Sequence, residues 1–250
     1  MMNTSVIAMN ALVDGPSLRQ RVQAFGRSAG TDESAVAASL LLQAWAVSVT
    51  RAAIASLVGA RRVPDLSASN TVLSVDRDGR PVEASLVTPR FAAVAGDEDA
   101  ASAPGVQLVS DEEALFAWAR TCLFDGHLGP LVEAIHDIAP VGRRLLWGNV
   151  AAATAGSFAV LSNQAPYFHD PDVLLADARR LLDAPGSPTG GLAELFAVPH
   201  EGGTRLFVRR QTCCLRYRLP DAPPTCLSCR LVPESERRHR IALRLQPTPA

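Results

Sequence analysis

The chain has 250 residues, of which 48% are hydrophobic, and this is enough to bury a substantial core. Its formal net charge of −1 gives no overall attraction to nucleic acid or to an anionic membrane, so we expect no nucleic-acid partner and at most peripheral membrane association. The N-terminal stretch lacks the basic start and long apolar run of a signal peptide.

A long helix is predicted near the N-terminus. Thr31, followed by two acidic residues, is a helix-start signal, and an apolar pattern then runs to Arg61–Arg62 and stops before Pro64. The segments Val36–Ala60 and Leu145–Leu161 resemble membrane spans, but both contain polar residues, and a span needs about 20 predominantly apolar ones. We therefore expect both segments to be buried helices of a folded protein.

Further elements follow in chain order. Ser110 and Glu113 form a capping box, which predicts the start of a helix. The expected elements are a β-hairpin of Thr71–Val75 and Val82–Val87 with its turn at Asp78-Gly79, a linker over Ala92–Gly105, and helices over about 110–122, 127–139, 142–161 and 171–184.

The sequence changes character after residue 203. Three short segments, Leu206–Arg209, Leu215–Leu219 and Ile241–Leu245, alternate like strands, and in the second one Arg216 and Arg218 share a face. Residues 204–250 hold 10 arginines and 3 acidic residues, whereas residues 1–203 hold 14 arginines and 22 acidic residues. The predicted fold class is α+β, mostly helical, with an N-terminal β-hairpin and a small C-terminal β and loop region around the cysteines. We divide it into an N-terminal α+β subdomain (1–100), a helical subdomain (104–203) and a basic C-terminal region (204–250).

Four of the five cysteines lie within seventeen residues, and without a signal peptide this clustering indicates metal binding rather than disulfides. They are Cys213, Cys214, Cys226 and Cys229. A Cys-x-x-Cys pair occurs in both zinc and iron–sulfur sites, but structural zinc sites prefer two to four residues within each pair, which counts against zinc for the vicinal pair. With no suitable histidine nearby, the pattern favours a [2Fe–2S] cluster; a zinc ion, a redox-active dithiol and chance clustering of the cysteines remain alternatives. Cys122 is expected to be a buried non-ligand.

At these cysteines the chain resembles the FhuF-type ferric-siderophore reductases, which end in a vicinal cysteine pair, a spacer of about ten residues and Cys-x-x-Cys. The spacer here has eleven residues, which we interpret as a loop insertion at Asp221–Pro224. The segments Gly126–Val132 and Arg144–Ala151 resemble the "HL-x-PL" and "LWGN" segments of the family, and Asn70–Val87 resembles its hairpin. The resemblance covers about Val36 to Leu231.

The resemblance implies a cytoplasmic enzyme that passes one electron from a [2Fe–2S] cluster to Fe(III) in an imported siderophore, mainly of the hydroxamate type, and releases Fe(II). It implies an unidentified electron-donor protein and no catalytic residue beyond the cluster. The alternative is a zinc-stabilised siderophore-binding or biosynthesis accessory module without redox activity. The sequence contains no P-loop, GxSxG or GxGxxG motif, so we expect no bound nucleotide or flavin.

Arginines flank the cysteines and are predicted to offset cluster charge and to dock an anionic siderophore or an acidic redox partner; the alternative is a solvated basic face. They are Arg209, Arg210, Arg216, Arg218 and Arg230. Arg216 and Arg218, expected on one strand face directly after a ligand, rank above Arg237, Arg238 and Arg240. Three residues lie in the segments that resemble the family less specifically than the cysteine motif does. Trp147 is expected to pack in the core, Asn149 to form hydrogen bonds with buried backbone groups, and His127 to start or cap its helix.

Overall fold

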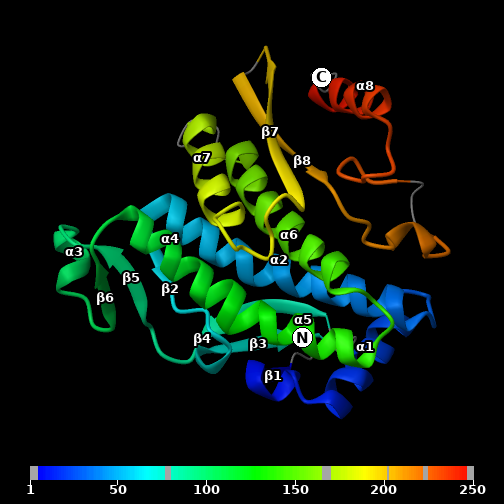
Figure 1. The fold of residues 1–250 in the computed structure, drawn as a ribbon, viewed down its shortest axis with the longest axis horizontal. Helices are drawn as coiled ribbons and strands as arrows, with labels where there is room; N and C mark the ends of the chain where they lie inside the picture. Colours follow the sequence, from blue (N-terminus) through cyan, green and yellow to red (C-terminus); the bar gives the residue numbers. More distant parts are fainter. Residues whose placement is uncertain (1–4, 77–79, 165–169, 202, 222–224, 247–250) are drawn as a thin grey trace.

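The computed structural model describes residues 5–76, 80–164, 170–201, 203–221 and 225–246. Two long helices, α2 (Ser34–Ala60) and α6 (Arg143–Gln164), lie side by side through its centre (Figure 1). Both are long and apolar enough to cross a membrane by length and composition alone. Large side chains on them, such as Trp45 and Phe158, are almost fully buried, and helices that are apolar all round are typical of a protein core. The prediction of two buried helices is confirmed.

Shorter helices surround this central pair. They are α1 (Gly15–Ser28), α4 (Glu112–Arg120), α5 (Gly129–Ile138) and α7 (Pro171–Leu182). A π-helical segment, Thr121–Leu128, joins α4 to α5, so two of the predicted helices form one continuous rod. The sequence analysis did not predict α1, although its start is well marked: Asp14 caps it and Pro16 lies in its first turn.

The start of α4 differs from the predicted capping box by one residue. The Asp111 carboxylate, and not Ser110, accepts a hydrogen bond from the Ala114 backbone N–H at 2.9 Å. Ser110 instead donates its hydroxyl proton to the Asp111 carboxylate at 3.0 Å. A carboxylate at the N-terminus of a helix also gains from the helix dipole, so aspartate outcompetes serine for the cap position.

The N-terminal half of the chain forms two small three-stranded sheets. One is antiparallel, with β1 (Ser5–Ala8), β3 (Thr71–Val75) and β4 (Pro81–Leu86) in that order. It confirms the predicted hairpin, whose turn at Asp78-Gly79 lies outside the described residues. The other contains β2 (Arg62–Pro64), β5 (Phe91–Val94) and β6 (Val106–Val109). Short 3₁₀ turns occur at Met9–Leu12 and Ala68–Asn70.

The predicted linker over Ala92–Gly105 is wrong. Its first residues belong to β5, where Ala92 and Ala93 are fully buried, and the short helix α3 (Glu98–Ala101) follows. Asp97 caps α3 and forms a bidentate ion pair with Arg62 at 2.9 Å for each bond. Small alanines that look like linker composition are here the residues that let strand β5 pack closely.

The C-terminal region contains one hairpin and one helix. The hairpin of β7 (Ala193–His200) and β8 (Gly203–Arg210) packs on α6 and confirms the predicted strand at Leu206–Arg209. The strands predicted at Leu215–Leu219 and Ile241–Leu245 are wrong. The first is a 3₁₀ turn at Arg216–Arg218, and the second is the end of helix α8 (Glu234–Leu245). Ion pairs at i,i+4 spacing, Glu234 with Arg238 and Glu236 with Arg240, favour the helix over a strand.

Mostly helical content with small sheets confirms the α+β class. Buried apolar side chains form one cluster that extends from Met9 to Cys214. The first two predicted subdomains therefore share a core with the start of the cysteine region, and the three-part division stays a prediction.

Candidate metal centre

The two cysteine pairs flank the end of β8 and the start of α8. Cys213 and Cys214 follow β8 by three and four residues, and Cys226-x-x-Cys229 precedes α8. The backbone N–H of Arg210 donates to the carbonyl oxygen of Ser228 at 2.9 Å, so main-chain bonding joins the end of β8 to the second cysteine loop.

The Cys229 thiol lies within electrostatic range of the other three thiols. Burial raises the pKa of the Cys229 thiol, and the thiols of Cys226, Cys214 and Cys213 raise it further. One cysteine of each pair is buried (Cys214 and Cys229), and the other is half-buried (Cys213 and Cys226). The structure therefore brings the four cysteines into one region, with one more exposed residue in each pair.

The chain turns sharply after the vicinal pair. Leu215 adopts a left-handed conformation with φ of 64°, which is strained for a residue with a side chain. Its backbone N–H donates to the Cys213 sulfur at 3.3 Å. Such N–H···S bonds stabilise a thiolate and raise the potential of iron–sulfur clusters. This turn explains why the predicted strand at Leu215–Leu219 was wrong. Arg216 and Arg218 lie in a 3₁₀ turn, so they do not share one face of a strand.

Among the described residues, which include all four cysteines, no three His, Cys, Asp or Glu side chains are arranged to hold one metal ion. The donor set does fit an iron–sulfur cluster in kind, because it consists of two pairs of free thiols and each iron of a [2Fe–2S] cluster takes two protein ligands. Ligation by Cys213, Cys214, Cys226 and Cys229 stays a prediction.

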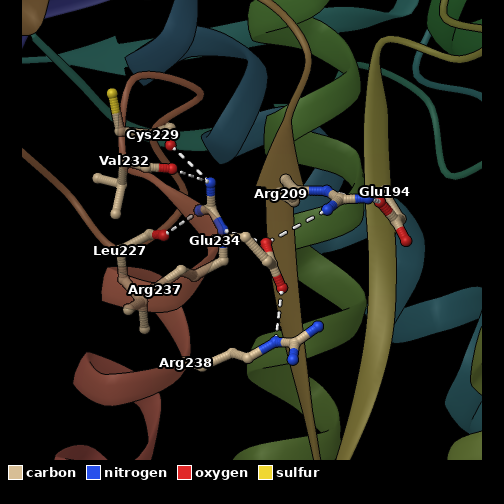
Figure 2. Close-up of polar contacts among 8 residues, drawn as sticks. All are labelled: Glu194, Arg209, Leu227, Cys229, Val232, Glu234, Arg237 and Arg238. Atoms are coloured by element: carbon tan, nitrogen blue, oxygen red, sulfur yellow. Dashed lines mark hydrogen bonds and ion pairs between the residues drawn. The ribbon is translucent and has the colours of Figure 1, made fainter.

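Arg237 of α8 holds the second cysteine loop, and the sequence analysis ranked it too low. Its side chain is 3% exposed, and its guanidinium donates to the carbonyl oxygens of Leu227, Cys229 and Val232 at 2.6, 2.9 and 3.1 Å (Figure 2). Ranking by distance along the sequence missed this role, because α8 brings Arg237 back onto the loop. The signal that points to it is a glutamate three residues earlier, directly after a proline, which marks the start of a helix.

A chain of charges links α8 to the hairpin. Glu234 lies between Arg209 and Arg238 and pairs with both, and Arg209 also pairs with Glu194 of β7 (Figure 2). Arg240 adds a further anchor by donating to the backbone and hydroxyl oxygens of Thr225, at 3.1 and 2.9 Å.

The arginines predicted to dock a partner do not form a single surface. Arg209 is paired as above, Arg210 is buried, and Arg218 pairs with Glu33. Arg216 and Arg230 are exposed. A docking role for these residues stays a prediction, and burial of Arg210 gives that residue a different environment from the others.

A buried polar network connects the helical body to the vicinal cysteines. The Asn149 amide donates to the backbone and hydroxyl oxygens of Ser39, each at 2.9 Å, and the Ser39 hydroxyl donates to the carbonyl oxygen of Cys214 at 2.9 Å. Arg210 in turn donates to the Asn149 carbonyl oxygen. The predicted role of Asn149, to satisfy buried backbone groups, is confirmed.

Gly148 allows α6 to approach the segment before the cysteines. A Cβ atom at this position would lie 1.8 Å from the Thr212 hydroxyl oxygen and 2.7 Å from its Cβ. We expect Gly148→Ala to lower the free energy of unfolding by about 1–3 kcal/mol, as overpacking does. Gly156→Ala on the same helix meets no atom within 4 Å and should stabilise by about 0.5–1 kcal/mol. Urea unfolding measures both, and equal effects of the two variants would contradict the close packing.

His127 and Cys122 lie in the π-helical segment, away from the other cysteines in the fold. His127 is fully buried inside the segment rather than at a helix start, its Nδ1 bonds to the Leu66 carbonyl at 2.6 Å, and burial lowers its pKa to about 4.

Cys122 is 3.7 Å from an Asp65 carboxylate oxygen. Burial, followed by the Asp65 charge, raises the pKa of the Cys122 thiol to about 12. The predicted burial of Cys122 is confirmed, and it stays a neutral thiol.

Residues 39–212 match the family model described as ferric iron reductase FhuF-like transporter, and the chain belongs to this family. The match ends at Thr212, directly before Cys213, so family membership rests on the helical body and not on the cysteine motif.

Two solved structures are similar in fold. Aerobactin synthetase IucA from a hypervirulent pathotype of Klebsiella pneumoniae aligns with a TM-score of 0.54 and 14% identity over 73% of this chain and 33% of that one. Aerobactin synthetase IucC from the same source aligns with a TM-score of 0.49 and 18% identity over 66% of this chain and 31% of that one. The chain thus spans about a third of the length of each synthetase. Comparison with curated protein sequences gave no match.

Proposed function

We propose that this protein is a cytoplasmic ferric-siderophore reductase that holds a [2Fe–2S] cluster on Cys213, Cys214, Cys226 and Cys229. Membership in the FhuF-like family supports a role with siderophore iron. The redox step is supported by four free cysteines in two pairs, each pair with one buried and one half-buried residue. A cluster held in this way sits at the edge of the fold, where a docked ferric siderophore can approach it.

The chemistry needs an electron carrier and a docking surface. When bound, a [2Fe–2S] cluster supplies one electron at a time. Hard oxygen donors hold Fe(III) more tightly than Fe(II) because of its higher charge, so one electron weakens the iron–siderophore complex. The chain's own residues fix the thiols: Leu215 donates to the Cys213 sulfur, Ser39 fixes the Cys214 carbonyl, and Arg237 fixes the Cys229 loop. A donor protein must supply the electron, and the exposed Arg216 and Arg230 favour an acidic one.

Metal and sulfide analysis of protein purified without oxygen from iron-replete cells tests the proposal. We expect about two iron and two sulfide per chain, a red-brown colour and an EPR signal only after one-electron reduction. The reduced protein should then release Fe(II) from a ferric hydroxamate, measured with an Fe(II)-specific chelator. One zinc per chain in a colourless protein would instead support the alternative, a zinc-stabilised siderophore-binding or biosynthesis module. The similarity in fold to IucA is compatible with that alternative.

A further inference from the structure

Arg210, the last residue of β8, is a buried cation with no anionic partner in the described part of the chain. Its exposed fraction is 3%, and its guanidinium donates to the amide oxygen of Asn149, which is neutral. Its Nε–H has no hydrogen-bond partner among the described residues. An isolated charge in a protein interior is unfavourable unless an opposite charge or a full set of acceptors compensates it.

The other buried arginine of the described residues shows what compensation looks like. Arg237 donates to three carbonyl oxygens, and its Nε–H, which like that of Arg210 makes no hydrogen bond among the described residues, lies 3.4 Å from the Glu234 carboxylate. Arg210 has one side-chain acceptor and no carboxylate in the same part of the chain. The difference indicates that the described residues do not supply all the acceptors that the Arg210 guanidinium needs.

A second unpartnered donor lies two residues further on. The Thr212 hydroxyl is buried and has no hydrogen-bond partner in the part of the chain that the structure describes, and Thr212 directly precedes Cys213. The backbone N–H of Arg210 bonds to Ser228, between Cys226 and Cys229. These two buried donors lie on the three residues that precede Cys213, and their side chains face α6, where the Thr212 hydroxyl lies against Gly148 and Arg210 bonds to Asn149. The network continues from Asn149 to Ser39, whose hydroxyl donates to the Cys214 carbonyl oxygen, and so links Arg210 to the vicinal cysteines.

We propose that Arg210 is the buried counter-ion of the anionic cluster held by the four cysteines and raises its reduction potential. This inference rests on the proposed function. An all-cysteine cluster is anionic in both oxidation states and gains one more negative charge on reduction, so a nearby positive charge favours the reduced form. Because Arg210 is buried, salt screens this interaction far less than it screens an exposed arginine.

Redox titration of Arg210→Met, with Arg210→Lys and Arg216→Met as controls, tests the inference. Methionine removes the charge and keeps much of the volume, lysine keeps the charge, and Arg216 is an exposed arginine close to Cys214. We expect Arg210→Met to lower the reduction equilibrium constant about tenfold or more, which is about 59 mV for one electron. Arg210→Lys and Arg216→Met should stay within about threefold of the wild type on the same scale. The effect of Arg210→Met should persist at high salt, and a potential equal to that of Arg216→Met would overturn the inference.

Unfolding of the metal-free proteins gives a second readout that does not need a loaded cluster. Without the cluster the Arg210 charge is uncompensated, so metal-free Arg210→Met should be at least as stable as metal-free wild type despite losing the bond to Asn149. Lower stability of the metal-free variant would show a structural role and overturn the inference. If the wild-type protein contains zinc, the proposed function itself is contradicted. If the wild-type protein contains an iron–sulfur cluster but Arg210→Met does not change its reduction potential, only the role of Arg210 is contradicted.

Discussion

Serine in place of any one of Cys213, Cys214, Cys226 or Cys229 should remove nearly all bound iron and sulfide, and with them the visible colour and the reduction of ferric hydroxamate. A serine oxygen is a poor substitute for thiolate toward iron, and a [2Fe–2S] cluster has no spare ligand. Iron and sulfide content and the visible absorption spectrum measure the loss for each variant.

Cys122→Ser is the matched control for this series. Cys122 is the fifth free cysteine, is buried, and lies beside Asp65 rather than beside the other thiols. We expect it to keep the colour and the iron. A colourless Cys122→Ser together with a coloured Cys213→Ser would show that the ligand assignment is wrong.

Arg237→Met should produce the second large effect, a faster loss of the cluster. The change removes the Arg237 donor from the carbonyl oxygens of Leu227, Cys229 and Val232, of which the Cys229 oxygen keeps the Val232 backbone N–H. A buried acceptor left unpaired costs about 1–3 kcal/mol. Outer-shell groups that orient metal ligands typically change metal affinity by about 10–100-fold. We expect iron release to a chelator to become faster by about that factor.

Arg238→Met provides the comparison on the same helix. The Arg238 side chain is 78% exposed and pairs only with Glu234 among the described residues, so iron release should stay close to that of the wild type. Arg237→Lys should rescue only in part, because an ammonium group lacks the fork of donors that reaches three carbonyls. Iron release from Arg238→Met as fast as from Arg237→Met would show that α8 acts through its overall charge and not through Arg237.

Long and strongly patterned segments of the sequence could be interpreted correctly. The apolar runs of α2 and α6 leave little alternative to buried helices, and the hairpin of β3 and β4 alternates over five to six residues on each side. The family was inferred from the cysteine motif together with the LWGN and HL-x-PL segments. Membership is confirmed by a match over residues 39–212, which contain both segments but not the four cysteines. The cysteine spacing predicted that four cysteines belong to one site, and the structure places them in one region.

Short segments failed because their local pattern is ambiguous. Five alternating residues at Ile241–Leu245 also fit a helix, and the ion pairs that decide for the helix begin at Glu234, before the alternation. The left-handed Leu215 has no sequence signal, since such a conformation is usually adopted by glycine or asparagine. The burial of Arg210 and Arg237 arises from the tertiary packing of β8 and α8, and no count of arginines along the chain reveals it.

The two halves of the ligand set are anchored in different ways, and this has a kinetic consequence for loading. The carbonyl of Cys214 is bonded to Ser39 in the central helix α2, a rigid part of the core. The loop of Cys226 and Cys229 depends on α8, where Arg237 and Ile241 are the buried residues of the helix. We therefore expect delivered iron to meet a preformed acceptor at Cys213 and Cys214 first. Closure of the α8 loop over it would be the slower second event, and it would set the rate at which newly synthesised protein matures.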